Sequence, residues 1–519
     1  MKLKMLKQFC LGFLVASLFL PLPAFSEEEN EDCPDCPKKE EKVKLDDVFV
    51  HAFGGGAVTY TPSSVIVDVD KYVKAGSVER IEDILMNIAG IDVMKSSGTP
   101  DPQAVILMRG FDDSRYIVAM DGRPITGSSG KTNTSIDWSS ITLADVEKIE
   151  IIRGGGSAEY EAAEGGIINL VMKKGKKRDT LVPRVTYTQD YSKVFDYSDP
   201  DAHSERVTAD GGVGGLTYFL NYGHKSSDGY LKNNQFRGYD YSTRFTYLFP
   251  FEGLFTFAYK ESYFDREEPM INWPGVIGYD SDYPKVPEDA DTIRTTWTNV
   301  SYDYPGMEAK KEVTNQNWDL SYEQPIGDTT LKMYGYKSKT EEDNWYVART
   351  GTAPNYVYSQ YYDGTKLTPT VNEDAVDGRG YIQRHLGCGT NWTLHPWQDN
   401  SLTLGYNFKR TEAEDMTKIY KIHAGYFDDL WIIDPKWTLK TGLRVTQVHH
   451  LTYPLLFLNE YPDYDNMTPA ERAAYKAEHQ YRHKFTPWFV LPKFALTYNI
   501  RPETNLFFTV SNDYDIPGC

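Results

Sequence analysis

Apolar and polar residues alternate along much of the C-terminal two thirds of the chain. Phe255, Phe257 and Tyr259 occupy every second position, with small or polar residues between them. The segments NWDLSYE (317–323) and SLTLGYNF (401–408) repeat this pattern. Because successive side chains of a strand point to opposite faces, a period of two predicts β-strands that are apolar on one face only.

Short turns and long connections separate these predicted strands in alternation. The tight turns fall at 211–215, 250–253, 325–328, 395–400, 434–436 and 500–505. Long polar, tyrosine-rich connections lie at 265–310, 341–378 and 451–484. About 13 strands fit between these signals, and outer-membrane barrels alternate short periplasmic turns with long outer loops in this way. Residues 181–519 therefore predict a transmembrane antiparallel β-barrel more readily than a soluble β-sandwich.

Residues 60–176 have a different hydrophobic pattern, which predicts a compact unit of helices and strands. A strand is predicted at 65–69, followed by a helix that Ser77 caps and Gly90 ends. Strands are also predicted for AVILMRG (104–110) and YIVAMDG (116–122), and a second short helix near 143–146. The unit precedes the alternating region, so the chain has two structural domains of different class.

The first residues indicate export. Three lysines precede an apolar run at 9–22, and a small-residue cleavage site follows at 24–26. This pattern is typical of a secretory signal peptide (1–26), too short to anchor a protein in a membrane. An acidic tether (27–44) follows, in which Cys33 and Cys36 form a C-x-x-C. That pair is either a redox or metal-binding motif or a plain part of a disordered linker.

Composition narrows the class further. Aromatic residues make up 14% of the chain, with 38 tyrosines and 10 tryptophans. Membrane barrels use such residues in their interfacial girdles. The formal net charge of −19 argues against a nucleic-acid partner.

A glycine-rich stretch at 149–175 resembles a nucleotide-binding loop only superficially. It lacks the Gly-Lys-Ser/Thr that opens the helix of a P-loop, and a β-branched strand follows the glycines where a dinucleotide fold requires a helix. No nucleophile elbow, H-E-x-x-H or convincing acid–base pair occurs elsewhere. We therefore expect neither an enzyme nor a bound cofactor.

Four segments, which follow one another in the order typical of the family, resemble the TonB-dependent outer-membrane receptors. They are LDDVFVHA (45–52), VERIEDILMNIAGIDV (78–93), ILMRGFDDSRYIVAMDGRPI (106–125) and VEKIEIIRGGGSAEYEAAEGGIINLVMKKG (146–175). The last segment departs from the family pattern, which usually has a proline after its Arg-Gly and a glycine soon after its tyrosine. The resemblance implies an α/β plug domain inside the lumen of the barrel.

The resemblance also implies roles for particular plug residues. The motif positions are Arg109, Gly110, Asp121, Gly122, Glu150, Arg153, Gly154, Tyr160, Gly165, Gly166 and Asn169. Arg109 and Arg153 are expected to pair with carboxylates of the barrel wall, the alternative being that they only stabilise the fold. Asp121 and Glu150 are expected to be structural. Glycines suit a unit that must pack its backbone closely.

The segment 45–52 resembles the energy-coupling box of the family. Its residues Asp47, Val48, Phe49, Val50, His51 and Ala52 are the candidate TonB-binding residues. An exposed extended segment can be gripped by β-augmentation, and the tether would hold it within reach of a periplasmic TonB-type partner. The alternative is that this segment is simply the first strand of the plug.

The resemblance leaves the transported small molecule open. Ferric siderophores or haem are expected first and cobalamin next. His449, His450, His479 and His483 bound one predicted outer loop, and the last two lie four residues apart on a predicted helix, at metal- or haem-ligand spacing. Ordinary exposed loop histidines are the alternative. A passive barrel without energy coupling and a soluble exported binding protein are the competing functional classes.

The number of predicted strands raises one further expectation. Plugged transporters need about 22 strands to enclose a folded plug, whereas about 13 are predicted here. We expect a partial barrel whose remaining strands lie either in a separate product or in a continuation beyond Cys519. The carboxylates facing Arg109 and Arg153 are expected there as well.

Overall fold

The computed structural model describes residues 57 to 512 apart from several internal segments, the longest of which are 286–309, 368–380 and 453–467. The predicted signal peptide, acidic tether and coupling segment lie outside the described residues. Among the described helices, none is both long enough and apolar enough to cross a bilayer.

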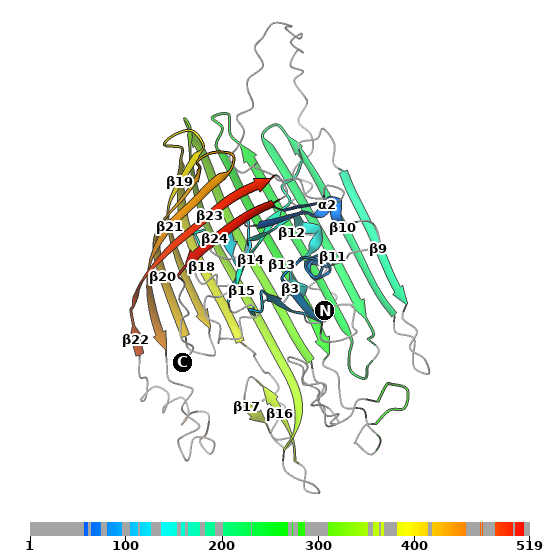
Figure 1. Cartoon of the computed structure of the whole chain (residues 1–519). Coiled ribbons are helices and arrows are strands. Elements are labelled where there is room, and N and C mark those ends of the chain that lie inside the picture. Colours follow the sequence, from blue (N-terminus) through cyan, green and yellow to red (C-terminus); the bar gives the residue numbers. More distant parts are fainter. Residues whose placement is uncertain are drawn as a thin grey trace. The chain divides into compact units, whose positions relative to one another are not determined.

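The first part of the described chain is the predicted α/β unit, here called the plug. Its elements are β1 (Val58–Tyr60), β2 (Ser64–Asp68), α2 (Val69–Tyr72), α3 (Ile81–Leu85), β3 (Ile91–Lys95), β4 (Ala104–Met108), β5 (Tyr116–Met120), β6 (Arg123–Pro124), η2 (Trp138–Ser140), η3 (Leu143–Asp145), β7 (Val146–Ile152) and β8 (Gly166–Met172). One sheet has the order β1-β2-β7-β8-β5-β6, and β3 pairs with β4 beside it. Figure 1 labels several of these elements.

The plug has its own hydrophobic core. The largest cluster of buried apolar side chains runs from Val65 to Met172 and contains no residue of the later strands. Trp138, Ile149 and Leu170 are among its members, each at most 2% exposed. Burial of this kind is the main stabilising term of a small domain, so the plug has a hydrophobic core that does not depend on the wall's apolar side chains.

The predicted helices of the plug are shorter than expected. α3 begins at Ile81, where the Asp83 carboxylate accepts a hydrogen bond from the Arg80 backbone N–H at 3.2 Å, and it ends at Leu85. Gly90 has a φ of +86°, in the left-handed region that terminates such segments. The helix expected near 143–146 is a single 3₁₀ turn, η3.

The remaining strands form one large antiparallel sheet, here called the barrel wall. They are β9 (Val182–Tyr191), β10 (Asp201–Val213), β11 (Leu216–Ser227), β12 (Phe236–Leu248), β13 (Leu254–Glu267), β14 (Lys310–Ile326), β15 (Thr329–Thr350), β16 (Val357–Tyr362), β17 (Thr365–Leu367), β18 (Tyr381–Leu394), β19 (Asn400–Ala413), β20 (Lys418–Ile432), β21 (Trp437–Thr452), β22 (His483–Phe485), β23 (Trp488–Arg501) and β24 (Thr504–Ser511). With β16, β17 and β22 off the main path, thirteen described strands follow one another from β9 to β24. β9 and β24 are the two edges of this described sheet (Figure 1).

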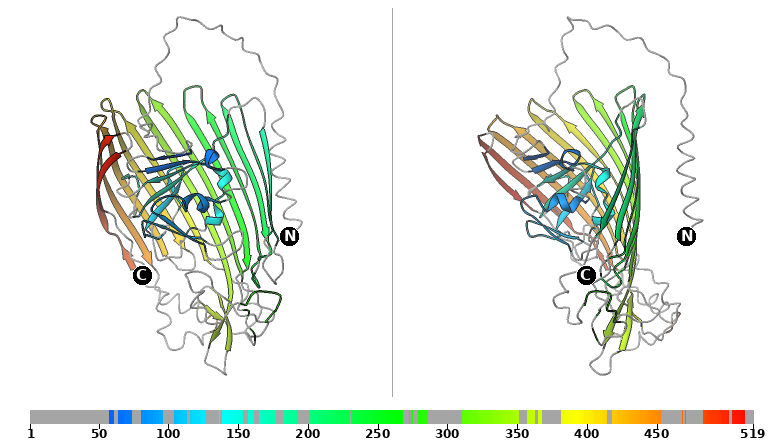
Figure 2. Two further views of the ribbon diagram at one scale, coloured as in Figure 1. Left: turned by 45° about the vertical axis from the view of Figure 1, so that its right-hand side comes forward. Right: turned by 90° about the vertical axis from the view of Figure 1, so that its right-hand side faces the viewer.

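All six predicted tight turns connect neighbouring strands of the barrel wall, which confirms them. One predicted boundary is wrong: the loop expected from 341 is strand as far as Thr350. β15 continues there because it gains hydrogen-bonding partners on β14 as far as Trp345 and on β16 beyond it. Figure 2 shows the resulting long strands and the curvature of the sheet.

The two faces of the barrel wall differ in polarity as the alternation predicted. Leu320 is 48% exposed on one face, and Phe255 and Leu404 are also exposed there. Thr256 and Lys260, at the intervening positions of β13, are buried on the other face. The wall is therefore apolar away from the plug and polar toward it, the pattern of a membrane barrel.

Candidate functional site

Four of the predicted plug residues, Asp121, Gly122, Glu150 and Asn169, meet in one polar cluster. The Gly122 N–H donates to the Asn169 side-chain oxygen at 2.9 Å, and the Asn169 amide donates to Glu150 at 2.8 Å. Asp121 accepts from the backbone N–H of Met172 at 3.0 Å. Asp121 and Gly122 both have positive φ, so the turn between β5 and β6 needs these partners to hold it. Tyr160 lies beside the cluster, its hydroxyl 3.4 Å from where a Cβ on Gly122 would be.

The backbone of the plug approaches itself most closely at Gly165 and Gly166. Gly166 has a φ of +127°, and a Cβ there would lie 2.4 Å from both the Ile152 carbonyl oxygen and the Met108 Cε. The Gly165 N–H donates to the Arg115 carbonyl at 2.8 Å. Only glycine fits the entry of β8 between β4 and β7, because any side chain would displace one of its neighbours.

The plug contacts the barrel wall through charged pairs. Asp145 is buried and pairs with Lys260 of β13 at 3.1 Å, and its other oxygen accepts from Ser242 of β12 at 2.7 Å. Asp121 pairs with Arg244 of β12 at 2.5 Å. In both pairs the plug supplies the carboxylate and the wall supplies the cation.

A third pair has the opposite polarity. The buried Arg123 guanidinium of β6 donates to Asp319 of β14, with a 3.0 Å bond from Nη2. The same guanidinium lies 4.7 Å from the centre of the Tyr336 ring on β15. This arginine therefore has both an ionic and a cation–π partner on the wall.

The residues Ala158, Glu159 and Tyr160, here called the plug tip, are held by polar side chains from β18 to β23. Arg444 donates to the carbonyl oxygens of Glu159 at 2.8 Å and Ala158 at 3.3 Å, and it is only 1% exposed. Lys493 donates to the Tyr160 carbonyl at 3.3 Å. The remaining contacts are Asp428 with the Ala158 N–H, Asn391 with the Glu159 carboxylate, and Asn407 with the Glu159 carbonyl.

Burial changes the acid–base behaviour of the plug tip. Burial raises the pKa of the Glu159 carboxyl, and the hydrogen bond from Asn391 opposes this only in part. Burial, together with the nearby Glu159 carboxylate, raises the pKa of the Tyr160 hydroxyl well above its usual value. Tyr160 therefore stays neutral and the plug tip carries at most one titrating charge.

The two arginines expected to meet the wall are not the ones that the structure describes there. Arg109 follows β4 with a φ of +56°, is exposed, and makes no ion pair with another described residue. Its N–H donates to the Gly90 carbonyl at 2.8 Å, which joins the end of β4 to the residue before β3. The turn that includes Gly110 is closed by the Phe111 N–H, which donates to the Met108 carbonyl at 3.0 Å. Arg153 and Gly154 lie outside the described residues, and their wall contacts remain predictions.

The alternation of the strands could have identified the wall residues that contact the plug, which were not predicted individually. Arg244, Lys260, Arg444 and Lys493 all stand at the polar phase of an alternating strand, where the side chain points toward the plug. Charged residues at such positions need partners because the lumen is partly shielded from water.

The predicted histidine group is only partly described. His449 lies near the end of β21, with its Nδ1 3.1 Å from the Thr486 hydroxyl. His450 and His483 lie on β21 and β22, two positions apart in their register, and their side chains are outside the description, as is His479. A ligand role for the four histidines remains a prediction.

Comparisons with known proteins agree with this architecture. A family model described as the TonB-dependent Receptor Plug Domain matches residues 57–167. The chain contains the plug domain of the TonB-dependent receptors. Both the expected family and the expected fold, a plug with a partial antiparallel barrel, are thereby confirmed.

The relatives of this chain are distant. It is 22% identical to the vitamin B12 transporter BtuB of Vibrio vulnificus over 410 residues, 74% of this chain and 58% of that protein. It is 26% identical to the ferric enterobactin receptor PirA of Pseudomonas aeruginosa over 190 residues, 34% of this chain and 26% of that protein. The unliganded ferric citrate transporter FecA superposes with a TM-score of 0.60 at 15% identity, covering 89% of this chain and 63% of that structure. The chain thus spans less than two thirds of the length of each.

Proposed function

We propose that this receptor imports a scarce metal chelate across the outer membrane, with energy relayed from the inner membrane by a TonB-type protein in the periplasm. The outer membrane has no ATP of its own, so uptake against a gradient requires a mechanical link to an energised partner. The segment 47–52 is the proposed binding site for this partner, and only a few residues join it to the plug. Its pairing with the partner would be strand addition.

The observation that carries the proposal is the division between apolar and polar contacts. The plug core consists of plug residues alone, whereas the contacts with the wall at Asp145, Asp121, Arg123 and the plug tip are hydrogen bonds and ion pairs. Water can replace polar contacts of this kind as they open, while an apolar interface would lose its burial. The plug can therefore shift or rearrange inside the lumen without exposing its core.

The coupling segment provides the direct test. Val48→Pro or Val50→Pro removes a backbone donor and fixes φ, so strand addition should fail and uptake should stop while binding of the ligand at the cell surface persists. Glu40→Pro, in the tether, is the matched control and should leave uptake intact. Loss of binding together with uptake would show instead that 47–52 is part of the plug fold.

For the ligand, we propose an iron chelate, a ferric siderophore or haem. The higher identity, 26%, is to the ferric enterobactin receptor, which supports this choice. Cobalamin is the second candidate, because similarity to the vitamin B12 transporter, at 22% identity, extends over 74% of this chain. Growth of a deletion strain on separate iron and corrinoid sources distinguishes them. A defect confined to corrinoid-dependent growth would exclude the iron assignment.

A further inference from the structure

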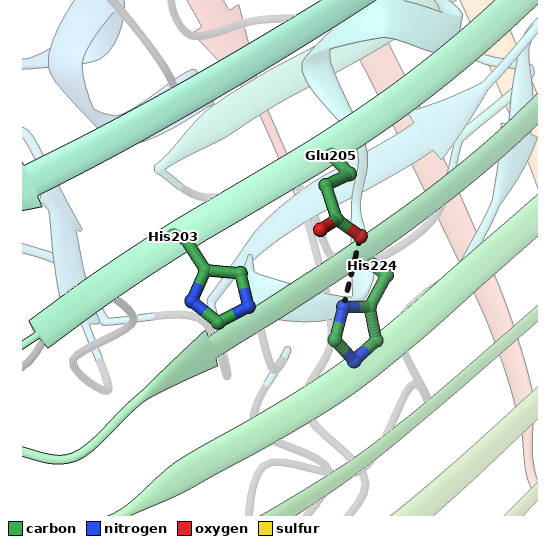
Figure 3. Close-up of side chains that lie close together, drawn as sticks. All are labelled: His203, Glu205 and His224. Atoms are coloured by element: carbon green, nitrogen blue, oxygen red, sulfur yellow. Dashed lines mark ion pairs between the residues drawn. The ribbon is translucent and has the colours of Figure 1, made fainter.

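Two histidines and a glutamate meet on neighbouring strands of the barrel wall, away from every residue discussed so far. His203 and Glu205 are two positions apart on β10, so both point to the same face. His224 lies directly opposite Glu205 on β11. Figure 3 shows the three side chains converging from these two strands.

The register of the strands places this cluster on the face that points away from the plug. Arg206 directly follows Glu205, so its side chain points to the opposite face of the sheet. There it forms an ion pair with Asp240 at 2.8 Å. Asp240 is two positions before Ser242, whose hydroxyl donates to Asp145 of the plug. Because faces alternate along a strand, His203, Glu205 and His224 lie on the outer face.

The geometry is close to that of a metal site. One ligand atom from each residue can be chosen so that all three lie within 4.8 Å of one another, and His224 Nδ1 is already 3.5 Å from Glu205 Oε2. Three ligands of a tetrahedral zinc ion, each about 2.0–2.2 Å from the metal, lie about 3.4 Å apart. Small side-chain rotations, which these partly exposed residues can make, would complete the set.

The neighbourhood supports His203 in a ligand role. The Ser226 hydroxyl lies 3.1 Å from Nε2 and 3.3 Å from Nδ1 of that ring. A hydrogen-bond partner outside the ligand set restricts how a ligating histidine ring can turn. No other group of three such residues occurs among the parts of the chain that the structure describes.

We propose that His203, Glu205 and His224 bind one divalent transition-metal ion of the zinc class. Two imidazole nitrogens and one carboxylate oxygen match zinc, copper or nickel, whereas calcium and magnesium prefer oxygen alone. Three protein ligands leave a fourth position open to water or to an external anion. The site is independent of the proposed transport pathway, since it lies on the opposite face of the wall.

The test is zinc titration of the full chain folded in detergent, with Co²⁺ absorption as a second probe of coordination geometry. One equivalent should bind to the unaltered protein, and His203→Ala or His224→Ala should each weaken binding by at least about tenfold. Glu205→Gln should weaken it less, because an amide oxygen remains, and Co²⁺ should give a tetrahedral spectrum only with all three residues present.

His423→Ala is the matched control. His423 is also an exposed histidine of the wall, and it contacts Tyr406 and Phe408 rather than a second histidine and a carboxylate. Its replacement should leave zinc affinity unchanged. Equal affinity of the unaltered protein and the His203→Ala/His224→Ala double variant, or an equal loss in His423→Ala, would overturn the site.

Discussion

The plug and the barrel wall have opposite distributions of apolar and polar residues. The plug buries its apolar side chains inside and places Asp121, Arg123 and Asp145 at its surface. The wall exposes apolar side chains such as Val213 and Leu506, at 75% and 62%, and buries Lys260 and Arg444 on the plug side. Each body is therefore polar where it meets the other, and each depends on different interactions for its stability.

This difference separates two kinds of substitution. Changes inside the plug core should destroy the plug itself, whereas changes at the polar contacts should alter how firmly an intact plug is held. We therefore expect the largest effects in the plug core and smaller effects at the polar contacts between plug and wall.

The largest effect is expected at Gly166. Gly166→Ala forces a side chain into contact with the Ile152 carbonyl at a φ of +127°, so the plug should lose about 4 kcal/mol or more of stability. Gly110→Ala is the matched control, because Gly110 also has a positive φ but nothing lies within 4 Å of its Cβ position. It should cost about 1 kcal/mol. Hydrogen exchange of β7 and β8 measures both, and equal losses would contradict the packing described.

A smaller effect is expected at the buried Asp145–Lys260 pair. Lys260→Met leaves a buried carboxylate without its cation and should loosen the plug–wall contact by about 3 kcal/mol. Adding Asp145→Asn removes the stranded charge, so the double variant should be more stable than Lys260→Met alone. Lys339→Met, at a partly exposed pair with Glu341, is the control and should change stability by less than about 1 kcal/mol. Urea unfolding, monitored by the hydrogen-exchange protection of η3, measures these changes.

The smallest effect is expected from the titration of Glu159. Its pKa is raised in the folded protein, so the contribution of this group to the plug-tip contact is complete below the unfolded pKa and is lost as pH rises through the folded one. The exchange protection of residues 157–160, corrected for intrinsic rates, should therefore fall across that pH range. Glu159→Gln should abolish this dependence, whereas Asp92→Asn, at an exposed position of β3, should preserve it.

The sequence predicted the architecture more completely than the contacts. Alternation and turn residues are local signals, so the six tight turns and the polarity of the wall faces could be predicted. The motif cluster of Asp121, Gly122 and Asn169 could be named from the family resemblance. The partners could not, because Asp145 meets Lys260 across 115 positions and only the folded lumen brings them together. The end of β15 was missed for the same reason, since its length depends on partners in other strands.

If the proposed function is right, the plug tip must leave the wall for transport to occur. Ala158 and Gly442 allow this to be tested, because a Cβ on Gly442 would lie 2.9 Å from the Ala158 Cβ. A disulfide needs a Cβ–Cβ separation of about 3.5–4.5 Å, so the two segments must move apart by roughly 1 Å as the bond forms. Cysteines at both positions, in a background where the exposed Cys388 and the remaining cysteines of the mature chain are serine, would lock the plug tip to the wall when oxidised. Either single-cysteine variant is the control.

The decisive measurement is ligand uptake by cells carrying the Ala158→Cys/Gly442→Cys receptor, before and after reduction. We predict that the oxidised receptor binds its ligand at the cell surface but does not import it, and that reduction restores import. Full uptake by the oxidised, demonstrably cross-linked receptor would contradict the claim.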